Sequence, residues 1–176
     1  MWLLWAELAA AAPFGFAPAD GAIGFHAVAS LHEFDGTAAQ FTADFDPVTK
    51  KGAIHLPVKA LSTGIGARDS RMIYTCLDAV TFPEVSFVID SVDDETGVLA
   101  KGQGQAGVTL HGTLRVRDVD QDFVIPAEAH WEGGNLRMRG SFPVFWADFG
   151  IPDPSILIST LRPDVSVRFD LLGKPK

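Results

Sequence analysis

Five histidines are the side chains of this sequence best suited to acid–base or metal chemistry. They are His26, His32, His55, His111 and His130. Zinc-binding histidines on one element recur at short spacings such as His-Glu-x-x-His, and no pair here has that spacing. The apolar residues that alternate with them turn all but His32 away from the inner face of their strands. The pattern favours surface or turn positions for these histidines over metal ligation.

Nucleophilic and phosphate-binding patterns lack the partners that their chemistry needs. Ser70 follows Asp69 but has no nearby histidine to act as its base. Cys76 is the only cysteine, so no intrachain disulfide forms, and its apolar neighbours are typical of a small buried side chain. The glycines of residues 102–107 lack the strand before and the helix after that a phosphate-binding loop requires. We therefore expect no enzymatic activity.

One segment with helical periodicity, at about residues 67–80, stands among segments with the period of strands. Its apolar residues share one helix face, and they are Met72, Ile73, Cys76, Leu77 and Val80. Pro83 ends any helix that reaches it, and apolar residues alternate with polar ones after it as in a strand. An aspartate suits a helix N-terminus, so Arg68 and Asp69 are expected to tie the helix start to the rim of the fold.

The rest of the chain alternates apolar and polar residues in short runs between turns, which is typical of antiparallel β structure. A turn at residues 132–135 places Ala127 opposite Gly140, and a turn at residues 118–121 places Gly112 opposite Ala127. These small residues would form one inward rung, whose free volume is filled either by phenylalanines or by a ligand. The sequence predicts an all-β fold, an antiparallel eight-stranded up-and-down barrel with one capping α-helix.

The length and net charge of the chain further restrict the classes of protein to which it can belong. The chain has 176 residues, which is enough for one domain with its own core. Its net charge of −8 argues against nucleic-acid binding, because that affinity comes largely from neutralising phosphates. We expect no nucleic-acid partner.

The first residues of the chain are similar to a secretory signal. Residues 1–12 are apolar and rich in alanine, and Pro13 follows them. Glu7 interrupts the run and no Lys or Arg precedes it, so a short helix packed on the domain is the alternative. We divide the chain into an N-terminal segment, residues 1–19, and a barrel domain, residues 20–176. A periplasmic or secreted protein is expected, and a cytoplasmic location stays open.

Several short segments occur along the chain as recognisable motifs, and they are Ile23–Phe25, Arg68–Met72, Phe82–Phe87, Thr109–Thr113, Arg139–Phe142 and Asp148–Ile151. Taken in this order, they resemble the motifs of the YceI-like family, whose members are lipocalin-like barrels that bind polyisoprenoid lipids, mostly in the bacterial periplasm. They cover nearly the whole domain. The stretch after the first strand, at residues 30–37, departs from the family pattern, and so does the apolar continuation of the helix after Met72.

The resemblance implies an apolar tunnel that holds an isoprenoid or quinone tail, with no cofactor and no catalysis. For each inward residue, plain core packing is the alternative to ligand contact. The candidate ligand-binding residues are Phe25, Phe41, Phe45, Ile54, Leu56, Val58, Met72, Cys76, Phe87, Ile89, Leu110, Gly112, Phe123, Ile125, Ala127, Met138 and Phe169.

The function hypothesis that follows is a non-enzymatic carrier or storage protein for an apolar lipid. A homodimer and a membrane protein are further candidate partners. The alternative is a protein-interaction barrel whose core is filled by its own side chains, partnering a membrane redox protein.

Overall fold

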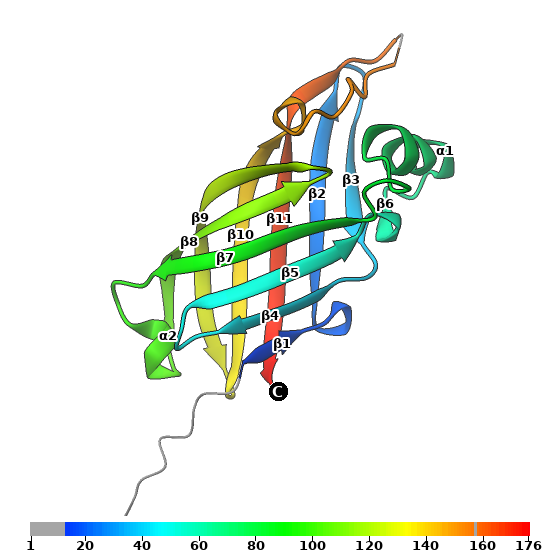
Figure 1. The fold of residues 1–176 in the computed structure, drawn as a ribbon. Helices are drawn as coiled ribbons and strands as arrows, with labels where there is room; N and C mark the ends of the chain where they lie inside the picture. Colours follow the sequence, from blue (N-terminus) through cyan, green and yellow to red (C-terminus); the bar gives the residue numbers. More distant parts are fainter. Residues whose placement is uncertain (1–12, 157) are drawn as a thin grey trace, which may run out of the picture.

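The computed structural model describes residues 13–156 and 158–176. Its strands form one antiparallel sheet within these residues, in the order β1-β4-β5-β7-β8-β9-β10-β11-β2-β3-β6 (Figure 1). The strands are β1 (Phe14–Phe16), β2 (Gly21–Ala29), β3 (Glu33–Ala38), β4 (Thr42–Asp46), β5 (Lys51–Pro57), β6 (Leu61–Ser62), β7 (Glu84–Asp93), β8 (Gln105–Val116), β9 (Val119–Glu132), β10 (Asn135–Phe145) and β11 (Leu161–Pro175).

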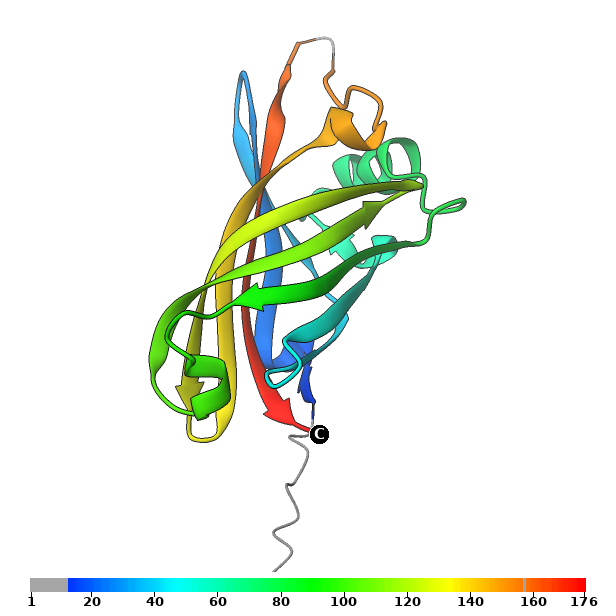
Figure 2. The same ribbon diagram turned by 60° about the vertical axis from the view of Figure 1, so that its left-hand side comes forward.

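The short strand β1 closes the sheet into a barrel. Phe14 pairs with Phe45 of β4 on one side and with Pro175 of β11 on the other. The resulting ring of eight strands confirms the predicted antiparallel, lipocalin-like barrel. β2, β3 and β6 extend the wall from the first part of β11 (Figures 1 and 2). The barrel therefore begins at Phe14 and not at residue 20, whereas the signal-like residues 1–12 lie outside the described part of the chain.

The predicted helix is present but ends earlier than residue 80. α1 (Gly66–Ser70) continues into a π-helix, Arg71–Cys76, in which the Leu77 N–H donates to the Met72 carbonyl. The wider π turn rotates the residues that follow it. Ala79 is therefore buried, whereas Val80, which was predicted to lie on the apolar face of the helix, is 79% exposed. α2 (Val98–Lys101) is a second, shorter helix at the opposite end of the barrel (Figure 1). Short 3₁₀ turns, each of three or four residues, occur at Pro18–Asp20, Val58–Ala60 and Trp146–Phe149.

One of the two predicted hairpin registers is correct. In the β9–β10 hairpin Ala127 pairs with Gly140, as expected from the turn at Gly133 and Gly134, both of which have positive φ. In the β8–β9 hairpin the prediction was wrong, because Gly112 pairs with Phe123 and not with Ala127. The chain turns at residues 117–118 instead, so the partners shift by an even number of residues and the inner face stays the same.

Phenylalanine rings occupy the space beside two of the small residues. A Cβ on Gly112 would lie 2.7 Å from the Phe87 ring, and one on Gly140 would lie 2.5 Å from the Phe169 ring. Both rings come from strands next to the glycine, so the wall fills its own gaps. The predicted rung is therefore not a continuous depression.

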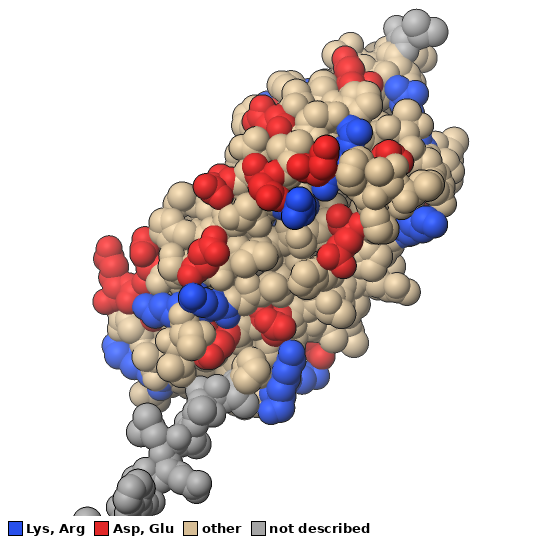
Figure 3. All heavy atoms as spheres, in the orientation of Figure 1, with Lys and Arg blue, Asp and Glu red and all other residues tan. Residues whose placement is uncertain are grey.

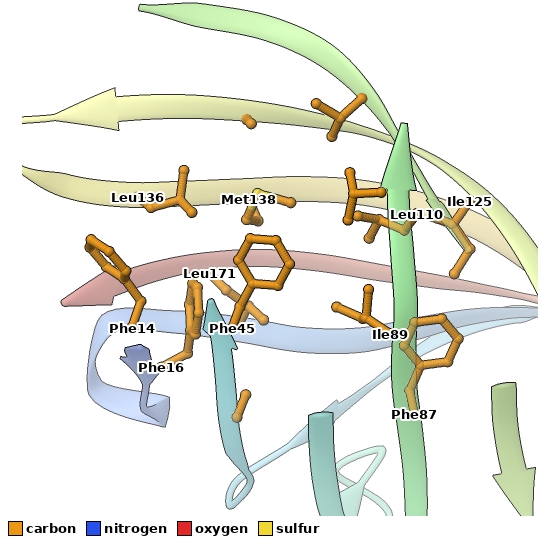
Figure 4. Close-up of a cluster of buried hydrophobic side chains, with 14 of the residues drawn as sticks. Phe14, Phe16, Phe45, Phe87, Ile89, Leu110, Ile125, Leu136, Met138 and Leu171 are labelled. Atoms are coloured by element: carbon orange, nitrogen blue, oxygen red, sulfur yellow. The ribbon is translucent and has the colours of Figure 1, made fainter. Parts of the chain in front are cut away.

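The main core lies inside the barrel, and a smaller one lies under the helix. Figure 4 shows Phe14, Phe16 and Phe45 directed toward Leu136 and Leu171 at the end that carries β1. The smaller cluster joins residues before, within and after the helical segment, and it consists of Val58, Ile73 and Ala79. One end of the barrel is thus packed solid, and the helix is held to the rim at the other end.

Candidate functional site

The barrel encloses a cavity of about 680 Å³. Its lining extends from Phe45 and Leu171, near the packed end, to Arg71 and Ser159 at the end that carries the helix. Apolar side chains supply nearly all of the lining, so the space offers hydrophobic contact with few hydrogen-bonding groups. The helix-bearing end is hereafter called the mouth.

Part of the free volume lies against the wall made by β10 and β11. Phe142, Val144, Val165 and Val167 face inward in the β10–β11 pair, yet all remain partly exposed. On the neighbouring strand β9 the inward residue Ile125 is fully buried. An inward side chain keeps accessible surface only where no other side chain covers it. The wall made by β10 and β11 therefore offers accessible apolar surface to a ligand.

Most of the predicted ligand-binding residues do line this cavity. They are Phe25, Phe45, Ile54, Leu56, Met72, Cys76, Phe87, Ile89, Leu110, Ile125, Met138 and Phe169. Their contact with a ligand stays a prediction. Burial raises the pKa of the Cys76 thiol, which favours its neutral form and matches its expected role as a small buried side chain.

The remaining predicted residues lie outside the lining. Phe41 is buried in the turn before β4, and Val58 follows β5 in a 3₁₀ turn of the smaller core. Phe123 stacks on Phe149 with ring centroids 6.4 Å apart, and its neighbours cover it from the cavity. Gly112 and Ala127 were placed side by side by the incorrect β8–β9 register. These positions contribute to packing. Strand alternation marks inward residues of both kinds, so it does not distinguish packed residues from those that line a cavity.

Several lining residues were not among those predicted. Ile23, Phe142, Phe149, Val165, Val167 and Leu171 all line the cavity. The alternation of β11, with Val165, Val167 and Phe169 on one face, contained the signal, but only the phenylalanine was selected. Phe149 comes after a strand and has no periodic signal of its own. It is placed by the 3₁₀ turn Trp146–Phe149 that folds back over the barrel.

Asp69 and Arg68 fix the helix to the chain before it. The Asp69 carboxylate accepts hydrogen bonds from the Thr63 N–H and from the Ser62 hydroxyl, each at 2.7 Å. Partial desolvation opposes ionisation of Asp69, but the hydrogen bonds from Thr63 and Ser62 lower its pKa below the usual value. Arg68 donates to the Thr63 hydroxyl and covers the Phe34 ring at 4.0 Å. These contacts of Asp69 and Arg68 form the predicted connection between the start of the helix and the rim of the barrel.

The outward histidines pair with carboxylates on the barrel surface. His55 contacts Glu84 at 2.8 Å and His111 contacts Asp93 at 2.7 Å. Within residues 13–156 and 158–176, no three metal-ligating side chains come together. Charges of both signs are interspersed over the face in Figure 3. Among the same residues, no helix has both the length and the apolar character needed to cross a bilayer.

An eight-stranded antiparallel barrel with an elongated apolar cavity and a helix at its mouth defines a lipocalin-like protein. Residues 14–172 match the model of the YceI-like domain, and the chain belongs to the YceI-like family. No curated protein sequence matches the chain.

Solved structures with the same fold come from several bacteria. A polyisoprenoid binding domain from Saccharophagus degradans, implicated in plant cell wall breakdown, superposes with a TM-score of 0.79 at 13% identity over 94% of this chain and 99% of its own. BcnA of Burkholderia cenocepacia gives 0.76 at 16% identity, over 89% and 98% of the two chains. The Campylobacter jejuni YCEI protein gives 0.65 at 19% identity, over 80% and 85%. At these identities the likeness shows the fold.

Proposed function

We propose that this protein binds an isoprenoid-type lipid, a polyisoprenoid or the tail of a quinone, inside the barrel and acts as a non-enzymatic carrier or store. The observation that supports this most is the apolar cavity of about 680 Å³. The polyisoprenoid-binding description of the Saccharophagus degradans domain with the same fold gives the class of ligand. The signal-like residues 1–12 favour a periplasmic or secreted site of action.

The affinity would come from burial of apolar surface. Each buried carbon group contributes about 0.8 kcal/mol, so one five-carbon isoprene unit gains on the order of 4 kcal/mol before the cost of ordering. A few units along β10 and β11 therefore give useful affinity with hardly any polar contact. Because the methyl-branched tail needs only shape and apolar surface, the cavity requires no cofactor and no reacting group.

The first test is to identify the bound molecule directly. Purified protein is extracted with organic solvent and the extract is analysed by mass spectrometry. We expect a lipid with an isoprenoid chain at close to one molecule per barrel. Repeated extraction without any lipid, together with failure of the purified protein to take up an added polyprenyl lipid, contradicts the proposal.

A matched pair of variants tests whether the lipid lies in the cavity. Val167 faces inward from β11 and is partly exposed to the cavity, whereas Val124 faces outward from β9 and is 64% exposed. Val167→Trp places an indole in the free volume and should lower lipid uptake at least tenfold. Val124→Trp adds the same ring to the outer surface and should leave uptake unchanged. Equal uptake by both variants would place the lipid elsewhere.

A further inference from the structure

One polar atom of the cavity lining lacks a hydrogen-bond partner. Ser159 is only 6% exposed, and its hydroxyl contacts no donor or acceptor among the described residues. Ser159 lines the cavity close to its mouth. Buried hydroxyls are nearly always hydrogen-bonded in folded proteins, because an unpaired one costs free energy. A serine kept in this state is suited to bind an atom that the ligand brings.

The backbone around Ser159 is held firmly, so the hydroxyl has a defined position. Ser159 and Ile156 exchange two backbone hydrogen bonds, of 2.9 and 3.0 Å. Thr160 is joined to Ser30 of the neighbouring strand end by a backbone bond of 2.9 Å, and its N–H also donates to the Ser30 hydroxyl. All the backbone groups of Ser159 are therefore used, and only its side chain is free.

Arg71 lies at the same mouth, and most of its guanidinium N–H groups have no hydrogen-bond partner among the described residues. It lines the cavity from the π-helix, and one terminal N–H donates to the Ser155 carbonyl at 3.2 Å. Its other N–H groups have no partner among the described residues, and no carboxylate there lies within ion-pair distance. Asp153 is the nearby acidic group, and its carboxylate accepts a hydrogen bond from the Ser155 N–H. The Arg68 guanidinium, also in the lining, adds a second positive charge but is engaged with Thr63.

We propose that Arg71 and Ser159 form a subsite for an anionic, oxygen-bearing headgroup of the bound lipid, such as a phosphate monoester. The inference rests on the proposed function, since it requires a lipid tail in the barrel. The tail lies along β10 and β11, and the headgroup stays at the mouth, where the guanidinium and the hydroxyl both donate to its oxygens. A guanidinium is a strong partner for phosphate because its hydrogen bonds are charge-assisted.

The test compares two ligands that share one tail. Farnesyl phosphate carries the anionic oxygens, and farnesene has the same carbon chain without any oxygen; binding is followed by tryptophan fluorescence. We expect the wild-type protein to bind farnesyl phosphate at least tenfold more tightly. Arg71→Gln and Ser159→Ala should each weaken farnesyl phosphate binding about tenfold and leave farnesene binding unchanged.

A control variant separates the subsite from general electrostatics. Arg162 lies at the same end of the barrel, is 62% exposed and pairs with Asp164. Arg162→Gln removes one charge, as Arg71→Gln does, and should leave both affinities unchanged. Equal loss in Arg162→Gln and Arg71→Gln overturns the proposal, and so does equal wild-type affinity for the two ligands. If the wild-type protein binds neither ligand, the proposed function itself fails.

The thermal stability of the unliganded Ser159→Ala protein provides an independent measurement. Because the hydroxyl is unpartnered, its removal should leave the melting temperature unchanged or raise it. A clear decrease would assign Ser159 a structural role and contradict its role in binding.

Discussion

Glycines on the inner face of the barrel lie beneath phenylalanine rings. Gly36 lies under Phe25 and Gly140 under Phe169, the residue paired with it across the strands. A flat ring over a glycine fills the space that two medium side chains would otherwise share, and it leaves the centre of the barrel open. At the residue scale, small residues therefore make room for the rings and not directly for a ligand.

Gly112 and Gly107 of β8 provide a test of this packing. A Cβ on Gly112 would lie 2.2 Å from the Val88 carbonyl oxygen and against the Phe87 ring, whereas one on Gly107 would meet nothing within 4 Å. Gly112→Ala should reduce the free energy of unfolding by about 1–3 kcal/mol through overpacking. Gly107→Ala should leave it within about 0.5 kcal/mol or raise it slightly. Urea unfolding measures both, and equal effects would contradict the packing described.

Short helices at the two ends of the barrel are held by aspartates. At the mouth, Asp69 binds the segment before α1, and the π-helix that follows supplies Met72 and Cys76 to the cavity. At the closed end, Asp94 accepts hydrogen bonds from the N–H groups of Val98 and Leu99 at the start of α2. At the element scale, side-chain oxygens stabilise helices that are too short to be stable alone.

The Asp94 contact should make stability depend on pH. Desolvation opposes ionisation of Asp94, but the hydrogen bonds from Leu99 and Val98 lower its pKa in the folded protein. A lowered folded-state pKa stabilises the protein above the unfolded value of about 3.9, and this contribution disappears as the pH falls through the folded value.

The comparison of the Asp94→Asn variant with the wild type measures this contribution. We expect the variant to be less stable by about 1 kcal/mol at pH 7 and the difference to decrease as the pH falls through the lowered folded-state pKa of Asp94. Asp90→Asn, at an exposed position of β7, serves as the control and should change stability little at pH 7 or in acid. A difference for Asp94→Asn that persists in acid would assign its effect to something other than the carboxylate charge.

The whole barrel depends on a strand of three residues. β1 joins β4 to β11, and without it these two strands would present unpaired edges. Phe14 and Phe16 anchor β1 in the core: Phe14 packs edge-on against Trp131 at 5.4 Å, and the Phe16 ring covers Gly173. The same two side chains help to seal the end opposite the mouth, so closure of the sheet and closure of the cavity have one cause.

Phe14→Ala tests the role of this strand. The side chain is only 6% exposed, and its removal leaves a cavity at the joint, so the free energy of unfolding should fall by about 3–5 kcal/mol. Leu31→Ala, at a position that is 67% exposed, is the control and should change stability by less than about 0.5 kcal/mol. Guanidinium unfolding distinguishes the two. A small effect of Phe14→Ala would mean that the barrel does not need β1 for closure.

The local pattern of the sequence was sufficient to predict much of this architecture. Alternation identified which residues of β7, β9 and β11 face inward, because successive side chains of a strand point to opposite faces. The Gly133–Gly134 pair determined the β9–β10 register, since those residues readily adopt the positive φ of a tight turn. The start of the helix was recognisable from Arg68 and Asp69.

Other features were decided only by the tertiary structure. Alternation has a period of two, so it could not distinguish the true β8–β9 register from one shifted by an even number of residues. Arg71 and Ser159 both line the cavity although they are far apart in the sequence, because the helix and the segment before β11 lie together at the mouth, where Arg71 donates to the Ser155 carbonyl. The free volume beside Val167 depends on how side chains from many strands fill one space. Such packing is a property of the assembled barrel, and no single segment of the sequence contains it.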